Sequence, residues 1–152
     1  MENKFTANAV VNITATASSV WNGLTNPELI KKYFFGSEAI SDWREGSPII
    51  FKGEWEGKSY EDKGTILIYE INKLFRYDYW SSMSAIEDRP ENYMIITYEL
   101  FEEGGVTMLT ITQDNIPGEE MKIHSEQSWR KVLNDLKQIL ENIPKPAERE
   151  IE

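Results

Sequence analysis

The stretch EEMKIHSEQSWRKVLNDLKQILENI, residues 119–143, decides the fold. Its inward positions recur at helical spacing and comprise Met121, Ser125, Ser128/Trp129, Val132, Leu133, Leu136, Leu140 and Ile143. Glu119 and Glu120 suit the positive end of a helix dipole, and Pro144 ends the pattern. The stretch therefore predicts one long helix with a single apolar face.

Upstream of this helix the apolar period changes twice. Residues 5–15 alternate between apolar and polar side chains, which predicts a strand. A possible cap at Ser18 or Ser19 predicts a short helix, and Asn26-Pro27-Glu28 predicts a second one that stops near Gly36. Residues 41–113 contain several alternating runs separated by short glycine-containing turns, including a strand from Gly64 to Ile71. These runs predict an antiparallel meander.

A helix of about 25 residues needs a broad apolar partner. A narrow flat sheet cannot cover it, whereas a strongly curved antiparallel sheet wrapped around it buries the whole apolar face. We therefore predict an α+β fold with a single domain over residues 1–143 and a charged tail over residues 144–152. Because a concave sheet and a straight helix touch unevenly, an apolar cavity between them is expected.

The composition excludes several functions. The 152 residues contain no cysteine and one histidine, so neither thiolate chemistry nor a multi-histidine metal site is expected. The net charge is −10, and residues 77–152 hold 16 acidic against 7 basic side chains, which argues against nucleic-acid and anionic-membrane partners. Neither a signal-peptide pattern nor an apolar run of membrane-spanning length is present, so a cytoplasmic protein is expected.

Five stretches resemble a known family. They are VWNGLTNPELIKKYFFG (20–36), DWREGSPIIFKGEWEGKSYEDKGTIL (42–67), ENYMIITYEL (91–100), TQDNIP (112–117) and HSEQSWRKVLNDLKQILE (124–141). In this order they resemble the START-related SRPBCC superfamily, in the AHSA-type branch named for the activator of heat-shock-protein-90 ATPase. The resemblance implies the helix-grip fold and binding of small hydrophobic or lipid-like molecules, and some relatives are aromatases or cyclases. The eukaryotic co-chaperone has a further N-terminal domain that this chain has no room for, so its activity is not expected here.

The predicted ligand cavity lies between the sheet and the last helix. Aromatic side chains on the inward faces offer stacking surfaces and hydrogen-bonding tips to a small hydrophobic or aromatic ligand. The predicted lining is Trp21, Phe51, Trp55, Tyr77, Tyr79, Met94, Ile96, Tyr98, Leu109, Ile111, Ser125, Trp129, Val132, Leu133 and Leu136. The alternative for each aromatic residue is that it only fills the core.

One histidine, one acidic cluster and one connecting loop each have two interpretations. His124 is either an acid/base group or an exposed side chain, and residues 82–92 form either a gate or a solvated loop. The acidic cluster Glu54, Glu56, Glu61 and Asp62 is either a pair of catalytic carboxylates or a charged surface. No nucleotide-binding, zinc or calcium motif is present, so neither a cofactor nor a metal is expected.

Three functional classes therefore stay open. A non-enzymatic protein that binds a small hydrophobic molecule is favoured over a protein-interaction module that docks through the acidic second half. An aromatase- or cyclase-like enzyme is the third. A monomer or a weak homodimer is expected.

Overall fold

A computed structural model describes residues 4–142. The elements are, in order, β1 (Phe5–Ile13), α1 (Ala17–Thr25), α2 (Pro27–Tyr33), β2 (Glu38–Ser41), β3 (Pro48–Trp55), β4 (Lys58–Glu70), β5 (Leu74–Tyr79), the 3-10 turn η1 (Pro90–Asn92), β6 (Met94–Glu103), β7 (Val106–Ile116) and α3 (Glu119–Glu141). This order confirms the predicted succession of strand, two short helices, meander and long helix. Within the described residues, no helix is both long enough and apolar enough to span a membrane.

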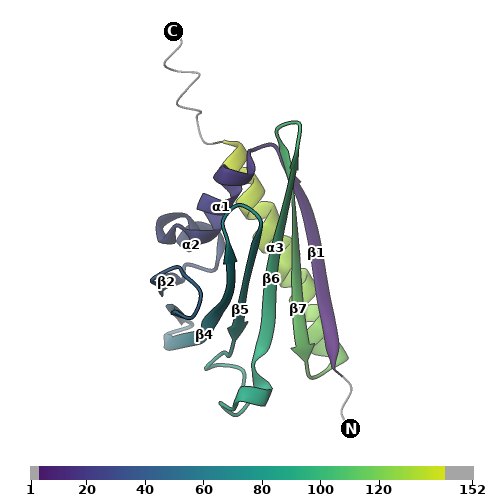
Figure 1. Cartoon of the computed structure of the whole chain (residues 1–152). Coiled ribbons are helices and arrows are strands. Elements are labelled where there is room, and N and C mark those ends of the chain that lie inside the picture. The colour runs from purple at the N-terminus through teal and green to yellow at the C-terminus, as the bar shows by residue number, and fades with distance from the viewer. Residues whose placement is uncertain (1–3, 143–152) are drawn as a thin grey trace.

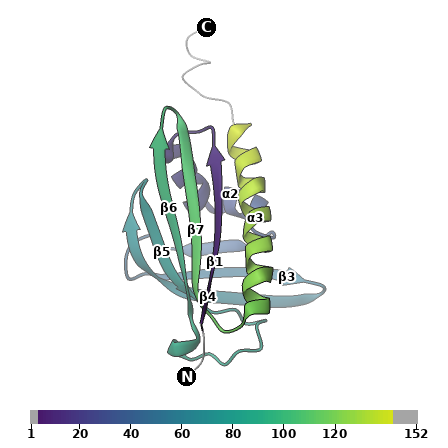
Figure 2. The same cartoon turned by 90° about the vertical axis from the view of Figure 1, so that its right-hand side faces the viewer.

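All seven strands form one antiparallel sheet in the order β1-β7-β6-β5-β4-β3-β2. The chain passes from β1 at one edge to β2 at the other edge through α1 and α2, and then returns strand by strand (Figure 1). The sheet is strongly curved, so that β1, β7 and β6 run alongside α3 while β3 and β4 cross behind it (Figure 2). The predicted α+β helix-grip architecture is confirmed.

The short helices begin and end where side-chain chemistry allows. Thr16 rather than Ser18 or Ser19 caps α1, because its hydroxyl accepts a hydrogen bond from the Ser19 amide at 3.1 Å. The predicted cap of α2 is confirmed, with the Asn26 side chain accepting from the Glu28 amide at 3.0 Å. This helix ends at Tyr33, before the predicted Gly36, because the chain turns through left-handed backbone conformations at residues 35 and 36.

The last helix covers the exposed edge of β1 with polar side chains. The Glu126 carboxylate accepts from the Asn8 amide at 3.2 Å, and Lys137 donates to the Asn12 carbonyl at 2.8 Å. The Glu141 carboxylate accepts from the Thr14 amide at 2.8 Å. An edge strand otherwise presents unpaired backbone groups to other chains, so these contacts both position α3 and protect the edge.

Some predicted boundaries differ from the structure. The first strand ends at Ile13 rather than residue 15, and β4 ends at Glu70, which leaves Ile71 exposed in a turn. The predicted strand from Gly64 was also too short at its start, since β4 begins at Lys58. Local alternation does not fix where pairing with a neighbouring strand begins and ends, so the ends of strands are predicted less well than their faces. Ile143, the predicted helix end at Pro144 and the predicted tail at 144–152 lie outside the described residues.

Candidate functional site

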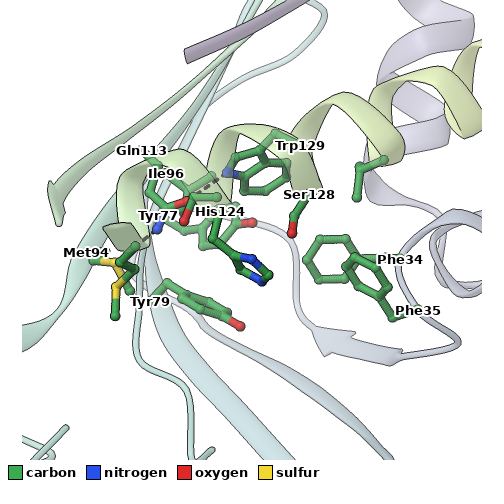
Figure 3. A pocket seen from close by; sticks show the side chains of 13 residues that line it. Phe34, Phe35, Tyr77, Tyr79, Met94, Ile96, Gln113, His124, Ser128 and Trp129 are labelled. Carbon is green, nitrogen blue, oxygen red and sulfur yellow. Dashed lines mark hydrogen bonds between the residues drawn. The ribbon is translucent and has the colours of Figure 1, made fainter. Parts of the chain in front are cut away.

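A cavity of about 200 Å³ lies between the first half of α3 and the concave face of the sheet (Figure 3). It is partly open to solvent. Its walls are mainly apolar and aromatic, and they comprise Phe34, Phe35, Tyr77, Tyr79, Met94, Ile96, Gln113, Met121, His124, Ser125, Ser128, Trp129 and Val132.

Most of these side chains point into the cavity because of their positions along α3 and along the strands. The α3 contributions fall at helical spacing, and each strand contributes alternate residues, such as Tyr77 and Tyr79 from β5. The remaining wall comes from the turn after α2. Phe34 packs against Phe51 and Trp129, with ring centroids 5.1 and 6.1 Å apart, so this turn closes the side of the cavity that the sheet leaves open.

Gln113 is the central polar group of the cavity wall. Its side-chain carbonyl accepts a hydrogen bond from the Trp129 indole N–H at 2.7 Å, and its amide nitrogen lies 3.0 Å from the Met94 sulfur. Gln113 is only 6% exposed, so a lost partner leaves a buried polar group unsatisfied. These contacts fix the plane of the Trp129 ring at the back of the cavity.

The tyrosine hydroxyls near the cavity are hydrogen-bonded and stay protonated at neutral pH. The Tyr77 and Tyr98 hydroxyls lie 2.8 Å apart, and the Tyr79 hydroxyl donates to Asp62 at 2.6 Å. Burial raises the pKa of Tyr77 and Tyr98, and burial together with the nearby Asp62 carboxylate raises the pKa of Tyr79. These groups can therefore donate hydrogen bonds, but they cannot act as phenolate bases.

A second, outer pocket of about 180 Å³ adjoins the cavity. The two share Phe34, Phe35 and Tyr79 as common walls. The rest of the outer pocket is formed by Ser37, Trp55, Tyr60, Asp62, Ser81 and Met83. The cavity and the outer pocket are therefore adjacent, and we refer to them as the inner and outer compartments.

The structure divides the fifteen predicted cavity residues into three groups. The first lines the cavity: Tyr77, Tyr79, Met94, Ile96, Ser125, Trp129 and Val132. The second is buried in the surrounding core without lining the cavity: Trp21, Phe51, Tyr98, Leu109, Ile111, Leu133 and Leu136. The third is Trp55 alone.

The inward prediction was wrong for Trp55. The side chain is 58% exposed, because it lies beside the Glu56-Gly57 turn at the tip of the β3–β4 hairpin. Figure 2 shows this hairpin extending past α3, so no second layer covers its tip. Trp55 instead forms part of the outer pocket.

Several lining residues were not predicted. Gln113 continues the inward alternation of Leu109 and Ile111, so a polar residue on a core face was the signal that could have identified it. Phe34 continues the apolar side of the second short helix, but it was not assigned to the cavity. Phe35 lies in the turn that follows, where no periodicity assigns a direction to a side chain. Met121 and Ser128 belong to the predicted inward face of the last helix, but they were not assigned to the cavity lining.

The structure gives the positions of His124 and of the loop at 82–92, but it does not test an acid/base role for His124 or a gating role for the loop. His124 is exposed, and Figure 3 shows its ring projecting from α3 into the cavity. The loop does not line the inner cavity, and only Met83 from it reaches the outer pocket. It is held by the Ser82 amide, which donates to Asp62 at 3.2 Å, and by an ion pair of 2.7 Å between Lys63 and Asp88.

The acidic cluster does not form a single site. Glu54, Glu56 and Glu61 are exposed, whereas Asp62 is buried in the wall of the outer pocket. Over residues 4–142, no group of three or more histidine, cysteine, aspartate or glutamate side chains is arranged to hold a metal ion.

The family is settled by comparison with known proteins. The family model described as "Activator of Hsp90 ATPase homolog 1-like protein" matches residues 14–141. The chain belongs to this family. The match confirms the resemblance carried by the five sequence stretches, and the family's domain includes every residue that lines the cavity. No curated protein matches the chain.

Solved structures of other proteins share the fold. The solution structure of ChR145 from Cytophaga hutchinsonii is 44% identical, covers 93% of this chain and 97% of its own, and superposes with a TM-score of 0.81. The Aha1 dimer from Colwellia psychrerythraea is 19% identical, covers 91% and 97%, and has a TM-score of 0.72. CalU16 from Micromonospora echinospora is 20% identical, covers 99% and 90%, and has a TM-score of 0.69.

Proposed function

We propose that the protein binds a small hydrophobic molecule, with an aromatic ring or a short acyl group in the inner cavity. The observation that carries this proposal is the cavity itself, about 200 Å³ in volume and lined largely by aromatic and aliphatic side chains. A dry apolar cavity of roughly 150 Å³ accommodates benzene, so this one has room for a somewhat larger ring system. Lipid-like binding is also what the superfamily resemblance implies.

The polar groups of the cavity favour binding over catalysis. The tyrosine hydroxyls are neutral donors, and Gln113 is occupied by Trp129 and Met94. Among the residues that line the inner cavity, a cyclase-like reaction would depend on His124 for acid/base chemistry. The cavity can therefore hold a ligand mainly through its apolar walls, because most of its polar groups already have partners.

A neutral aromatic probe tests the proposal. 1-Naphthalenemethanol is titrated into the labelled protein while NMR follows the Trp129 indole N–H and the methyl groups of Met94, Ile96 and Val132. We expect saturable shifts at these groups. Ser128→Phe, which fills the cavity from α3, abolishes the shifts, and the matched control Ser128→Ala retains them.

Two outcomes contradict the proposal. The first is a set of shifts scattered over the outer surface of the sheet. The second is undiminished binding by Ser128→Phe, provided that its unfolding curve matches that of Ser128→Ala.

A further inference from the structure

The outer pocket contains a buried carboxylate with no cation beside it. Asp62 is 7% exposed, and none of the ion pairs between residues 4 and 142 involves it. Its two hydrogen bonds come from the Tyr79 hydroxyl and the Ser82 amide. A carboxylate has about four acceptor positions, so Asp62 keeps acceptor capacity at the pocket wall.

The position of this carboxylate in the fold is specific. Asp62 pairs with Phe51 on β3, so its side chain lies on the concave face of the sheet, where apolar residues are the rule. Its neighbours Glu61 and Lys63 differ from it, since Glu61 is exposed and Lys63 is paired with Asp88. Burial of a carboxylate without a cation is costly, which makes an approaching positive charge favourable at this point.

Aromatic rings share the outer pocket with the carboxylate. Phe34, Phe35, Trp55, Tyr60 and Tyr79 line the same pocket. Rings in one pocket with a carboxylate suit an organic ammonium group, because the carboxylate accepts its N–H hydrogen bonds while the ring faces attract the positive charge.

The hydroxyl groups of Ser37 and Tyr60 form another polar part of the outer pocket wall. The Tyr60 hydroxyl lies 2.5 Å from the Ser37 hydroxyl. Tyr60 lies directly over Gly53, where an added Cβ would be 2.5 Å from the tyrosine oxygen. Glycine at this position therefore lets the ring lie flat and leaves its hydroxyl in the pocket wall.

We infer that the outer pocket binds the ammonium group of a small aromatic or aliphatic amine whose apolar body occupies the inner cavity. Phe34, Phe35 and Tyr79 line both compartments, so the two lie side by side and a molecule that extends from one into the other would contact all three. The net charge of −10 adds a general attraction for cations. This inference rests on the proposed function, and it names the chemical class of the ligand.

Three probes with one naphthyl body test the inference. They are 1-naphthylmethylamine, which is a cation at pH 7, the neutral 1-naphthalenemethanol and the anionic 1-naphthoate. We expect the amine to bind roughly ten- to a hundredfold more tightly than the alcohol, and the naphthoate to bind most weakly, as measured by calorimetry.

Two variants locate the source of the preference. Asp62→Asn reduces the amine-to-alcohol affinity ratio to near one, whereas Glu61→Gln, which removes the same charge from the adjacent exposed position, leaves the ratio within about twofold. Trp55→Leu at the exposed hairpin tip lowers the amine-to-alcohol affinity ratio about threefold. This variant tests the inference even if Asp62→Asn does not fold.

Failure of the inference can be distinguished from failure of the proposed function. If the alcohol binds in the cavity and the amine binds no better, the ammonium inference is wrong and the proposed function stands. The ammonium inference is also wrong if Asp62→Asn and Glu61→Gln change the affinity ratio equally. If none of the three probes binds, the proposed function itself is wrong.

Discussion

Gly64 of β4 lies against the backbone of β5 with no room for a side chain, and replacing it tests the geometry that positions the outer pocket. A Cβ added at Gly64 would lie 1.7 Å from the Asp78 carbonyl oxygen. An ordinary carbon–oxygen contact needs about 3.3 Å, so Gly64→Ala forces the two backbones apart by roughly 1.6 Å. A hydrogen bond near 3 Å does not survive a displacement of that size.

Three hydrogen bonds cross this point. Lys63 and Trp80 exchange two backbone bonds of 3.0 and 2.8 Å, and the Thr65 amide donates to the Asp78 carboxylate at 2.7 Å. At about 0.5–1.5 kcal/mol each, their loss lowers the free energy of unfolding by about 2–4 kcal/mol. Tyr79 follows Asp78 directly, so the displacement also separates Tyr79 from its partner Asp62.

Urea unfolding followed by circular dichroism measures the effect. Gly118→Ala is the matched control, because an added Cβ there meets no atom within 4 Å. We expect the control to change stability by less than about 1 kcal/mol, since Gly118 precedes α3 in an extended conformation. If Gly64→Ala is as stable as Gly118→Ala, the conclusion that Gly64 packs too closely against Asp78 for a side chain is wrong.

Three further predictions concern α3. Trp129→Phe removes the donor to the buried Gln113 carbonyl and should lower the free energy of unfolding, measured by circular dichroism, by about 1–3 kcal/mol. Adding Gln113→Leu should recover part of this loss. If the effects of the two substitutions simply add, the two residues are not coupled and the prediction is wrong. Leu136→Ala empties a fully buried position and should cost about 3–5 kcal/mol, whereas Ile123→Ala on the exposed side of the same helix should cost less than about 0.5 kcal/mol; equal losses would contradict the packing. The hydrogen bond from the Asn8 amide, together with Lys122, lowers the pKa of Glu126, so its ionised form is stabilised by folding. That stabilisation is present above the unfolded pKa and is lost as pH falls through the folded one, so the stability difference between wild type and Glu126→Gln should shrink from pH 7 to pH 3, and a constant difference would refute it.

The helix and strand faces show what local pattern predicts well. The inward series of α3 identified Trp129, Val132, Leu133, Leu136 and Leu140, and all five are buried. Alternation in the strands likewise placed Tyr77 and Ile96 on the concave face. These predictions succeeded because the direction of a side chain in a helix or strand follows from its position along the chain.

The same pattern failed where a side chain's surroundings are not local. Trp55 has the correct alternation for the concave face, yet the hairpin tip extends beyond the layer that would cover it. Phe35 lies in a turn without a period, and it lines both compartments. Seven of the fifteen predicted cavity residues pack in the core instead, because the curvature of the sheet decides where helix and sheet separate.

The sequence by itself determined the elements, their order, the α+β class and the apolar faces, since periodicity and capping act over a few residues. Only the tertiary structure decided that β1 lies beside β7, that Gln113 holds Trp129, and that Asp62 faces Tyr79 in a pocket shared with aromatic side chains. Each of these depends on residues far apart in the chain that meet because the sheet curves around α3. The length of the last helix predicted a curved sheet, but the place where sheet and helix separate, and so the lining of the candidate site, depends on the tertiary structure.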